Sequence, residues 1–278
     1  MKKLIIMFFV ALFFCDAVVA KSPIELKIIS YNIRTLARDG KNSWKYRRHA
    51  TEKMLAEEAP DAFGLQEAMV AHLQYIDSVC PKYARVGVGR DDGKMGGEIM
   101  AIYYNTERFD LLDSGTFWLS ETPLQVSRGW DAVCFRTTTW VKLRDRNSGR
   151  KFYYFNTHFD HKGRVAQTES VKLIVEKIKS IAGKKATVIL TGDFNIEPGN
   201  DIFVPLNEFM ESARLTAPVT DSKGSFNQFG AMKRKCILDY IFYRGKKVEC
   251  VKFRTLDGDY GAPFISDHYP IEAVFNVK

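Results

Sequence analysis

The stretch ATVILTGDFN, residues 186–195, joins an apolar strand pattern to a polar cluster. Residues 186–191 are apolar over enough consecutive positions to predict a strand buried on both faces. The polar residues Asp193 and Asn195 follow where this strand is expected to end. A rigid scaffold often presents functional groups to solvent at such points. The stretch therefore predicts a buried sheet with a functional site at its edge.

Polar residues at strand ends recur along the chain in two arrangements. In one arrangement the polar residue follows its strand, and in the other it precedes its strand. If all of these residues meet at one rim, the two groups of strands must run in opposite directions, as they do in mixed sheets. The residues that follow strands are Asn32, Glu67, His158 and Asp193, and those that precede strands are Asp239, Asp267 and His268.

Strand patterns outnumber helix patterns in this chain. Roughly ten strands with few, non-alternating helices favour an α/β protein in which two packed sheets carry helices outside, and they disfavour a doubly wound fold or a (β/α)8 barrel. The expected strands are 24–31, 61–66, 83–88, 98–104, 109–119, 133–144, 151–157, 186–191, 237–243, 248–254 and 271–277; the expected helices are 44–58, 69–79, 164–182 and a short one near 201–211.

The first twenty residues have the layout of a secretory signal peptide. Lys2 and Lys3 form a basic head, residues 4–14 are an apolar run too short to span a bilayer, and small residues precede Lys21. We therefore expect cleavage after Ala20 and export to the periplasm or the medium. A lipoprotein signal at Cys15 is the alternative, although bulky Phe14 stands where such signals have a small residue.

Length and composition describe one ordinary globular domain, residues 21–278. The chain has 278 residues, 46% hydrophobic and 27% charged, which excludes a disordered or collagen-like protein. Its formal net charge is +8, and removal of residues 1–20 takes away two lysines and one aspartate to leave +7. A basic surface suits an anionic substrate such as a nucleic acid, a phospholipid headgroup or a sugar phosphate, but it also serves solubility alone.

Cysteine usage gives no metal motif. Four cysteines remain in the mature chain, and an exported location permits disulfides. No CxxC or His-rich spacing indicates a zinc site, and the pairing of the cysteines cannot be read from the sequence. From the sequence we infer no stable protein partner, and we expect no membrane-spanning segment after the signal is cleaved.

The polar clusters contain the parts of a metal-assisted phosphoester hydrolase. Carboxylates and amides without thiolates favour a hard, oxygen-liganded ion such as Mg²⁺. The histidines beside them are suited to donate hydrogen bonds to a phosphoryl oxygen. The clusters lie in the segments SYNIR (30–34), GLQE (64–67), GGEIMAIYY (96–104), FNTHFDH (155–161), TGDFN (191–195), LDYIF (238–242) and SDHYP (266–270).

The ordered series SYNIR, LQE, NTH, TGDFN, LDY and SDHYP resembles the endonuclease/exonuclease/phosphatase superfamily over nearly the whole mature chain. This resemblance implies a four-layer α/β/β/α sandwich of two mixed sheets and Mg²⁺- or Mn²⁺-dependent cleavage of phosphoesters. Within the superfamily the chain is most similar to small exported bacterial members that look like the deadenylase branch.

The resemblance assigns one set of residues to the metal and the attacking water. Glu67 matches a metal ligand, with Asn32 beside it and Asp267 as a further carboxylate near the ion. A sparse site of this kind is expected because Mg²⁺ keeps several waters. Asp193 matches the residue that orients or deprotonates the attacking water, and Asn195 matches the residue that holds the phosphate or that water.

The resemblance assigns a second set of residues to the phosphoryl group. Asp239 is expected to hydrogen-bond His268 and to favour its imidazolium form, which stabilises charge on the phosphate. His158 is similar to a second catalytic histidine, and Glu98 is similar to the carboxylate that pairs with that histidine in deoxyribonuclease I. The histidines without a matched role are His49, His72 and His161.

Substrate specificity is left open by the sequence, because loops around a shared centre set it. Segments 115–123 and 127–140 place aromatic and basic residues near each other, and among these residues Trp118 and Arg136 are candidate substrate-binding residues. The first hypothesis is a phosphodiesterase or nuclease. The second is a phosphomonoesterase acting on a sugar, inositol or lipid phosphate, and the third is a catalytically silent anion-binding protein.

Overall fold

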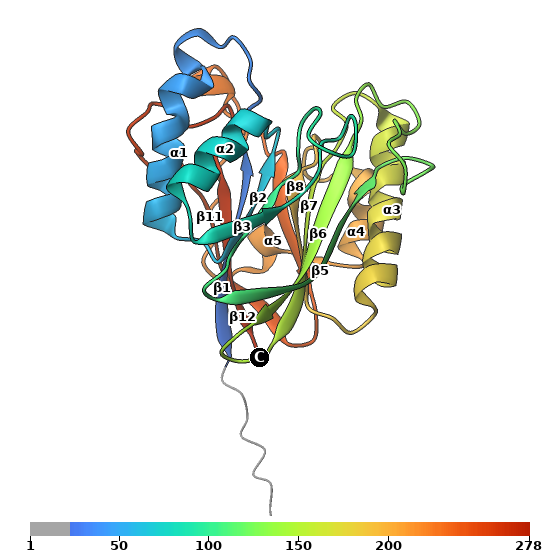
Figure 1. Ribbon diagram of the computed structural model, residues 1–278. Helices are drawn as coiled ribbons and strands as arrows, with labels where there is room; N and C mark the ends of the chain where they lie inside the picture. The colour runs from blue at the N-terminus through green and yellow to red at the C-terminus, as the bar shows by residue number, and fades with distance from the viewer. Residues whose placement is uncertain (1–22) are drawn as a thin grey trace, which may run out of the picture.

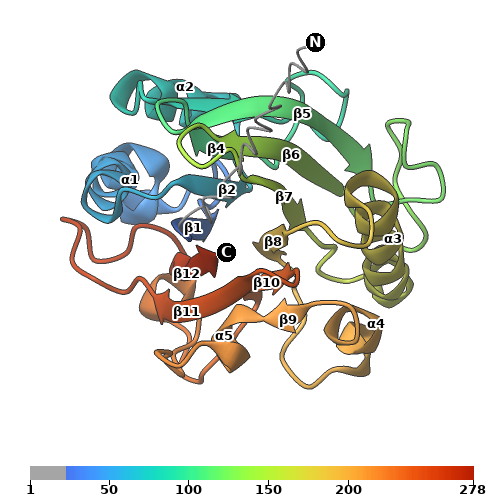
Figure 2. The same cartoon turned by 90° about the horizontal axis from the view of Figure 1, so that it is seen from below.

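Two six-stranded β-sheets pack face to face in the computed structural model, which describes residues 23–278. The predicted export signal, residues 1–20, lies outside the described residues. Helices cover the outer face of each sheet, so the order of layers is α/β/β/α (Figures 1 and 2). The predicted fold class is confirmed.

The first sheet is mixed and brings both ends of the described chain together. β1 pairs in parallel with β2 and antiparallel with β12. The strand order is β11-β12-β1-β2-β4-β3. Its strands are β1 (Ile24–Asn32), β2 (Ala62–Gln66), β3 (Tyr83–Val86), β4 (Ile102–Asn105), β11 (Val248–Thr255) and β12 (Ile271–Val277).

The second sheet is also mixed and contains the strand from which the sequence analysis started. β8 pairs in parallel with β7 and antiparallel with β10. The strand order is β5-β6-β7-β8-β10-β9. Its strands are β5 (Phe109–Trp118), β6 (Thr137–Asp145), β7 (Lys151–His158), β8 (Val188–Asp193), β9 (Glu211–Ser212) and β10 (Asp239–Arg244).

Two helices pack on the first sheet and the longest helix packs on the second. The apolar side chains of α1 and α2 join those of β1, β2 and β4 in one buried cluster, and those of α3 join β7 and β8 in another. No helix within residues 23–278 is long and apolar enough to cross a membrane. The helices are α1 (Trp44–Glu58), α2 (Val70–Val79), α3 (Arg164–Ala182), α4 (Val204–Asn207) and α5 (Ala213–Thr216), with short 3₁₀ turns η1 (Gly40–Asn42), η2 (Asp201–Phe203) and η3 (Gln228–Gly230).

The central core lies between the two sheets and is apolar over most of its length. Towards one end it becomes polar, where Gln66 donates to Asn156 over 2.6 Å and Asn156 donates back to the Leu65 carbonyl over 2.8 Å. Gly64 is required here, because a Cβ atom would lie 2.5 Å from the Asn156 side chain. These contacts fix how the two sheets sit against each other beside the site. The four described cysteines are free thiols.

The strand directions bring the polar strand ends to one rim, as the sequence predicts. β1 starts beside the C-terminus at the bottom of Figure 1, so Asn32 at its far end lies at the opposite edge. In the second sheet His158, Asp193 and Asp239 are register neighbours on β7, β8 and β10. The rim therefore collects side chains from both sheets.

Three predicted elements differ from the structure. The strand predicted at 98–104 is restricted to β4, because Gly97 adopts φ +76° and, among residues 98–101, Ile99 alone pairs, through isolated bridges. The strand predicted at 133–144 begins at Thr137, because the backbone N–H groups of residues 133 and 134 bond a side chain, Asp160, instead of a strand. The helix predicted near 201–211 breaks into η2, α4 and β9, because Glu211 pairs with β10.

Candidate active site

A pocket of about 440 Å³ opens at the shared rim of the two sheets. Its volume falls within the range of small-molecule sites. Both sheets contribute to its lining, which includes Glu67, His158, Asp193, Asn195, Asp267 and His268. The structure therefore brings together most of the side chains that the sequence analysis selected.

Asn32 and Glu67 form the carboxylate and amide part of the site. The Asn32 amide donates to Glu67 Oε1 over 3.0 Å and to Asp193 Oδ2 over 2.9 Å, so one side chain bridges two carboxylates. The Thr35 N–H donates to Glu67 Oε2 over 2.9 Å. Burial raises the pKa of Glu67, but these hydrogen bonds outweigh it and lower the pKa below its ordinary value. Glu67 is therefore held as an anion.

Asp267 faces the same part of the pocket from the segment that precedes β12. Its Oδ2 lies 3.5 Å from Nη1 of Arg34, and its carbonyl accepts hydrogen bonds from the N–H groups of Asn227 and Gln228. Burial raises the pKa of Asp267. A divalent cation would relieve this cost by pairing with the carboxylate.

Backbone strain concentrates in this pocket. Arg34, Glu67 and Asn195 all line it, and all three are non-glycine residues with φ between +51° and +62°. Left-handed backbone of this kind costs free energy and persists at sites where function over-determines the conformation. Strain at three of the lining residues supports a functional role for the pocket.

His268 lies between two carboxylates. Its Nδ1 is 2.8 Å from Asp239 Oδ2, and its Nε2 is 3.7 Å from Asp193 Oδ2. The predicted Asp239–His268 contact is confirmed. Burial lowers the pKa of His268, but Asp239 and Asp193 outweigh it and raise the pKa to about 10. The imidazole is therefore a cation at neutral pH, with its Nδ1–H donated to Asp239.

Asp193 has the protonation behaviour of a base that works at neutral pH. Its Oδ1 accepts the Asn195 N–H over 2.9 Å, and its Oδ2 accepts the Asn32 amide. Burial raises the pKa of Asp193 to about 7, against the lowering effect of His268. A general base is most efficient when its pKa lies near the working pH.

His158 is the second histidine of the site and differs from His268 in charge. The Asn195 amide donates to its Nε2 over 3.1 Å. Burial lowers the pKa of His158 well below its ordinary value, and Arg136 and Arg90 lower it further. The site thus holds one charged and one neutral imidazole.

The expected partner of His158 is shared with an arginine. Glu98 Oε2 lies 3.9 Å from His158 Nδ1, which is ion-pair range and too long for a hydrogen bond. The same oxygen accepts from Arg90 Nη1 over 2.5 Å. The predicted Glu98–His158 pairing is therefore only a proximity in the structure, because Arg90 takes the hydrogen bond.

The two candidate substrate-binding residues have different positions. Arg136 lines the pocket and its Nη2 lies 3.2 Å from His161 Nδ1. Trp118 is 6% exposed and is not part of the lining, and its indole N–H donates to the Arg90 carbonyl over 2.8 Å. Trp118 therefore supports the segment that carries Arg90 rather than the substrate.

Sequence reasoning missed several lining residues. His161 lines the pocket, although it has no matched role in the motifs, and so do Arg34 and Arg90, neither of which was selected as a site residue. SYNIR includes Arg34, so its position beside Asn32 was the available signal. No sequence motif marks Arg90, which lies with its partner Glu98 in one irregular loop. His49 and His72 lie within α1 and α2, as expected.

The oxygen donors of the site fit a divalent cation. Glu67 and Asp267 supply carboxylates and Asn32 supplies an amide, which are hard ligands of the kind that Mg²⁺ or Mn²⁺ takes. These oxygen donors agree with the ion that the sequence predicts. Ligand atoms of Glu67, His158 and Asp193 also lie within 4.8 Å of one another, a group that shares only Glu67 with the predicted ligands.

The family of the chain follows from comparison with known proteins. Residues 29–268 match the model of the Endonuclease/Exonuclease/phosphatase family. The chain belongs to this family, whose members are metal-dependent phosphoester hydrolases, and the protein is therefore an enzyme of that class.

Solved bacterial structures of the family are similar to this chain over nearly all of its length. An endonuclease/exonuclease/phosphatase from Bacteroides vulgatus is 33% identical, with a TM-score of 0.87 over 92% of this chain and 100% of that one. The mannosyl-6-phosphatase of Bacteroides thetaiotaomicron is 32% identical, with a TM-score of 0.84 over 89% of this chain and 98% of that one.

A more distant structure shares the fold alone. The catalytic domain of human Nocturnin, solved with a bound sulfate anion, is 20% identical, with a TM-score of 0.71 over 94% of this chain and 95% of that one. The recognised superfamily is confirmed by these comparisons, and they leave the substrate open.

Proposed function

We propose that the protein is an exported, Mg²⁺-dependent phosphomonoesterase that hydrolyses a small phosphorylated sugar. The observation that carries the proposal is the pocket of about 440 Å³, whose lining combines the catalytic carboxylates and histidines with Arg136. A pocket of this volume suits a monosaccharide phosphate. Mn²⁺ is the alternative ion.

The charges of the pocket favour a small substrate over nucleic acid. Nucleic-acid binding depends on lysines and arginines that neutralise successive phosphates. The arginines of this pocket already face carboxylates: Arg34 faces Asp39 and Asp267, and Arg90 faces Glu98. The sequence analysis placed a phosphodiesterase first, and these pairs favour its second hypothesis.

The relatives support the same choice. The chain is 32% identical to the mannosyl-6-phosphatase of Bacteroides thetaiotaomicron, which it covers almost completely. A phosphorylated sugar is thus the substrate class of a similar protein with the same fold. The catalytically silent alternative is disfavoured because every matched catalytic position retains its side chain.

The oxygen ligands for the metal would be Glu67, Asp267 and Asn32. When bound, the ion supplies positive charge to the phosphate and to the charge that develops during its transfer. Asn32 bridges Glu67 and Asp193, because its amide donates to both carboxylates. The carboxylate that would hold the ion is thereby fixed beside the one that acts on water.

Asp193 and the histidines would act on the attacking water and on the phosphate. Asp193 accepts a proton from the attacking water, because its pKa of about 7 makes it a base at neutral pH. Imidazolium His268 donates Nε2–H towards the phosphoryl oxygens and is held in that form by Asp239. Asn195 fixes the ring of His158, whose neutral form adds a further hydrogen-bonding group.

Export rests on residues 1–20. Their basic head, apolar run and small residues before Lys21 support cleavage after Ala20. Amino-terminal sequencing of protein recovered from the periplasm or medium tests this part. We expect the mature chain to begin at Lys21, and a chain that retains Met1 inside the cell contradicts export.

Metal dependence and reaction type are tested together with two chromogenic substrates. We expect the purified protein to hydrolyse p-nitrophenyl phosphate with Mg²⁺ or Mn²⁺, and to do so faster than bis(p-nitrophenyl) phosphate. EDTA should stop the reaction and added Mg²⁺ should restore it. Full activity in EDTA contradicts the proposed metal dependence, and a preference for the diester contradicts the proposed phosphomonoesterase activity.

A further inference from the structure

Arg136 is a buried guanidinium in the wall of the active-site pocket. It is only 5% exposed, yet its one hydrogen-bond contact among the described residues joins Nη2 to His161 Nδ1 over 3.2 Å. Its Nη1 lies 4.0 Å from Glu98 Oε2, and its Nε, 3.7 Å from Asp160 Oδ2, has no hydrogen-bond partner. Because a guanidinium carries five N–H donors, most of the donors of Arg136 have no hydrogen-bond partner among the described residues.

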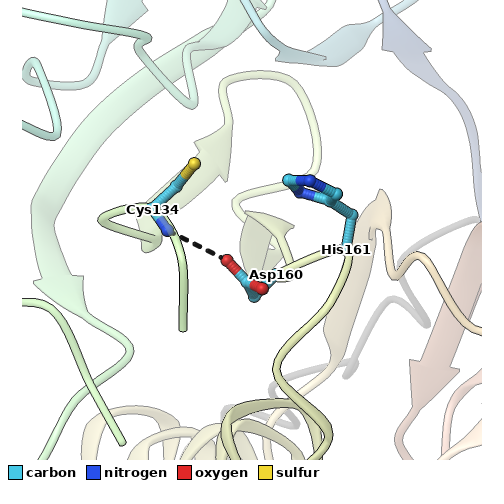
Figure 3. A group of neighbouring side chains, drawn as sticks. All are labelled: Cys134, Asp160 and His161. Carbon is cyan, nitrogen blue, oxygen red and sulfur yellow. Dashed lines mark hydrogen bonds between the residues drawn. The ribbon is translucent and has the colours of Figure 1, made fainter. Parts of the chain in front are cut away.

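Asp160 holds the two loops that carry this wall (Figure 3). Its Oδ2 accepts the N–H groups of Val133 and Cys134, and its Oδ1 accepts those of Lys162 and Gly163, all over 2.8–3.1 Å. Four backbone donors therefore converge on one carboxylate and fix the segment before Arg136 relative to the segment after β7.

The cluster of Cys134, Asp160 and His161 is explained by this loop anchor. A metal would need lone pairs of Asp160 that four backbone N–H groups already use. Burial raises the pKa of Asp160, but those hydrogen bonds outweigh it and lower the pKa. Asp160 is thus a positioning anion, and its loops deliver Arg136 and His161 to the pocket.

The carboxylates around this wall outnumber its arginines. Arg90 and Arg136 supply two positive charges, and Asp91, Glu98 and Asp160 supply three negative charges within 4.0 Å of them. Burial lowers the pKa of His161 and Arg136 lowers it further, so the imidazole stays neutral at pH 7. A second anionic group on the substrate would therefore gain little net attraction, and it would meet Glu98.

Such a wall suits hydroxyl groups, because a hydroxyl both donates and accepts. We propose that Arg136, with Arg90, Glu98 and His161, recognises hydroxyl groups on the sugar of the substrate and sets specificity for polyhydroxylated phosphomonoesters. This inference rests on the proposed phosphomonoesterase activity. In this arrangement the scissile phosphate would lie against Asp193 and His268, and the sugar hydroxyl groups would reach Arg136 and its neighbours.

The proposal implies discrimination by unmet hydrogen bonds. A substrate without hydroxyl groups leaves the buried guanidinium and the Glu98 carboxylate facing a group that cannot pair with them. Sites built to bond a hydroxyl reject analogues that lack it more strongly than apolar pockets reject small changes of size. A hexose 6-phosphate should therefore have a higher kcat/KM than an alkyl phosphate of similar length.

The test compares a hexose 6-phosphate with p-nitrophenyl phosphate, whose leaving group has no hydroxyl besides the ester oxygen. We expect Arg136→Met to lower the ratio of the two kcat/KM values by about 30-fold, the scale of one or two charged hydrogen bonds. Arg136→Lys should restore part of it. The control is Arg128→Met, an exposed arginine on the preceding loop, which should keep the wild-type ratio and rates.

His161→Ala keeps the test informative if the buried Arg136 variants fold poorly. His161 is an exposed residue, so its replacement should leave the melting temperature unchanged. It should lower the ratio of the two kcat/KM values by about 5-fold. An equal fall in both kcat/KM values, or an unchanged ratio, in the folded variants overturns the specificity role. Wild-type protein that cleaves neither monoester but cleaves bis(p-nitrophenyl) phosphate instead overturns the proposed function.

Discussion

Arg47 of α1 connects the two loops that carry the metal side of the site, and its replacement gives a quantitative test of the fold at that point. The guanidinium is buried, with 1% of the residue exposed. It donates to the carbonyls of Ile33 and Arg34, which follow β1, and to that of Ile265, which precedes Asp267. The donor–acceptor distances are 2.6 Å to the Ile33 carbonyl, 3.0 Å to that of Arg34 and 2.8 Å to that of Ile265.

The expected cost of Arg47→Met follows from these hydrogen bonds. A fourth bond, from Nε to the Asn42 carbonyl over 2.9 Å, completes the set. At about 1 kcal/mol net for each bond, with the carbonyls left buried, the free energy of unfolding should fall by about 4 kcal/mol. This is a large part of the 5–15 kcal/mol typical of a domain.

Two assays are needed. Stability is measured by equilibrium denaturation in urea, and activity is measured as a function of Mg²⁺ concentration. We expect Arg47→Met to lower the midpoint and to raise the Mg²⁺ concentration needed for half-maximal rate, because Arg34 and Asp267 lose their common support. Arg48→Met is the matched control: Arg48 is exposed on the same helix and lies over the Tyr75 ring at 5.1 Å, so it should cost less than about 1 kcal/mol. Equal losses in the two variants would refute the reasoning.

Three other predictions follow from the same structure. His72 is fully buried, and burial and Arg47 lower its pKa to about 3. Below pH 6.5 the unfolded chain therefore binds a proton that the folded chain does not bind, so stability falls as the pH falls. Between pH 7 and pH 5 the wild type should lose about 2 kcal/mol more stability than His72→Asn in urea titrations, and equal losses would show that His72 is not the cause. Gly64→Ala should destabilise the protein by about 2 kcal/mol or more, because the added Cβ would lie 2.5 Å from Asn156; a melting temperature equal to that of the wild type would contradict this packing. Asp193→Ala and His268→Ala should each lower kcat by about 10²-fold or more, and unchanged rates would mean that their roles are misassigned.

The polar strand ends could be predicted from sequence because the signal is local. An apolar strand pattern that ends at Asp193, or begins at Asp239, reveals which side chains reach the rim of the sheet, and the resemblance supplies their partners. The opposite directions of β8 and β10 then follow from the need to place both residues at one rim. The Asp239–His268 bond was predicted from the resemblance to the superfamily and is confirmed.

The supports of the site could not be predicted, because they depend on contacts between distant segments. Arg47 reaches a carbonyl 218 positions away, and its helical pattern marks it only as a charged residue. Asp160 ends the strand pattern expected from residue 133 by binding N–H groups 26 and 27 positions earlier. A single buried side chain of this kind changes the local structure without leaving a periodic signal in the sequence.

The most direct test of the central claim is the release of inorganic phosphate from hexose 6-phosphates, with mannose 6-phosphate among them, by purified protein in Mg²⁺. Bis(p-nitrophenyl) phosphate and single-stranded DNA serve as competing substrate classes in the same buffer. The account predicts that a hexose 6-phosphate has the highest kcat/KM and that EDTA abolishes its hydrolysis. Cleavage of the diesters without release of phosphate from any hexose 6-phosphate would contradict it.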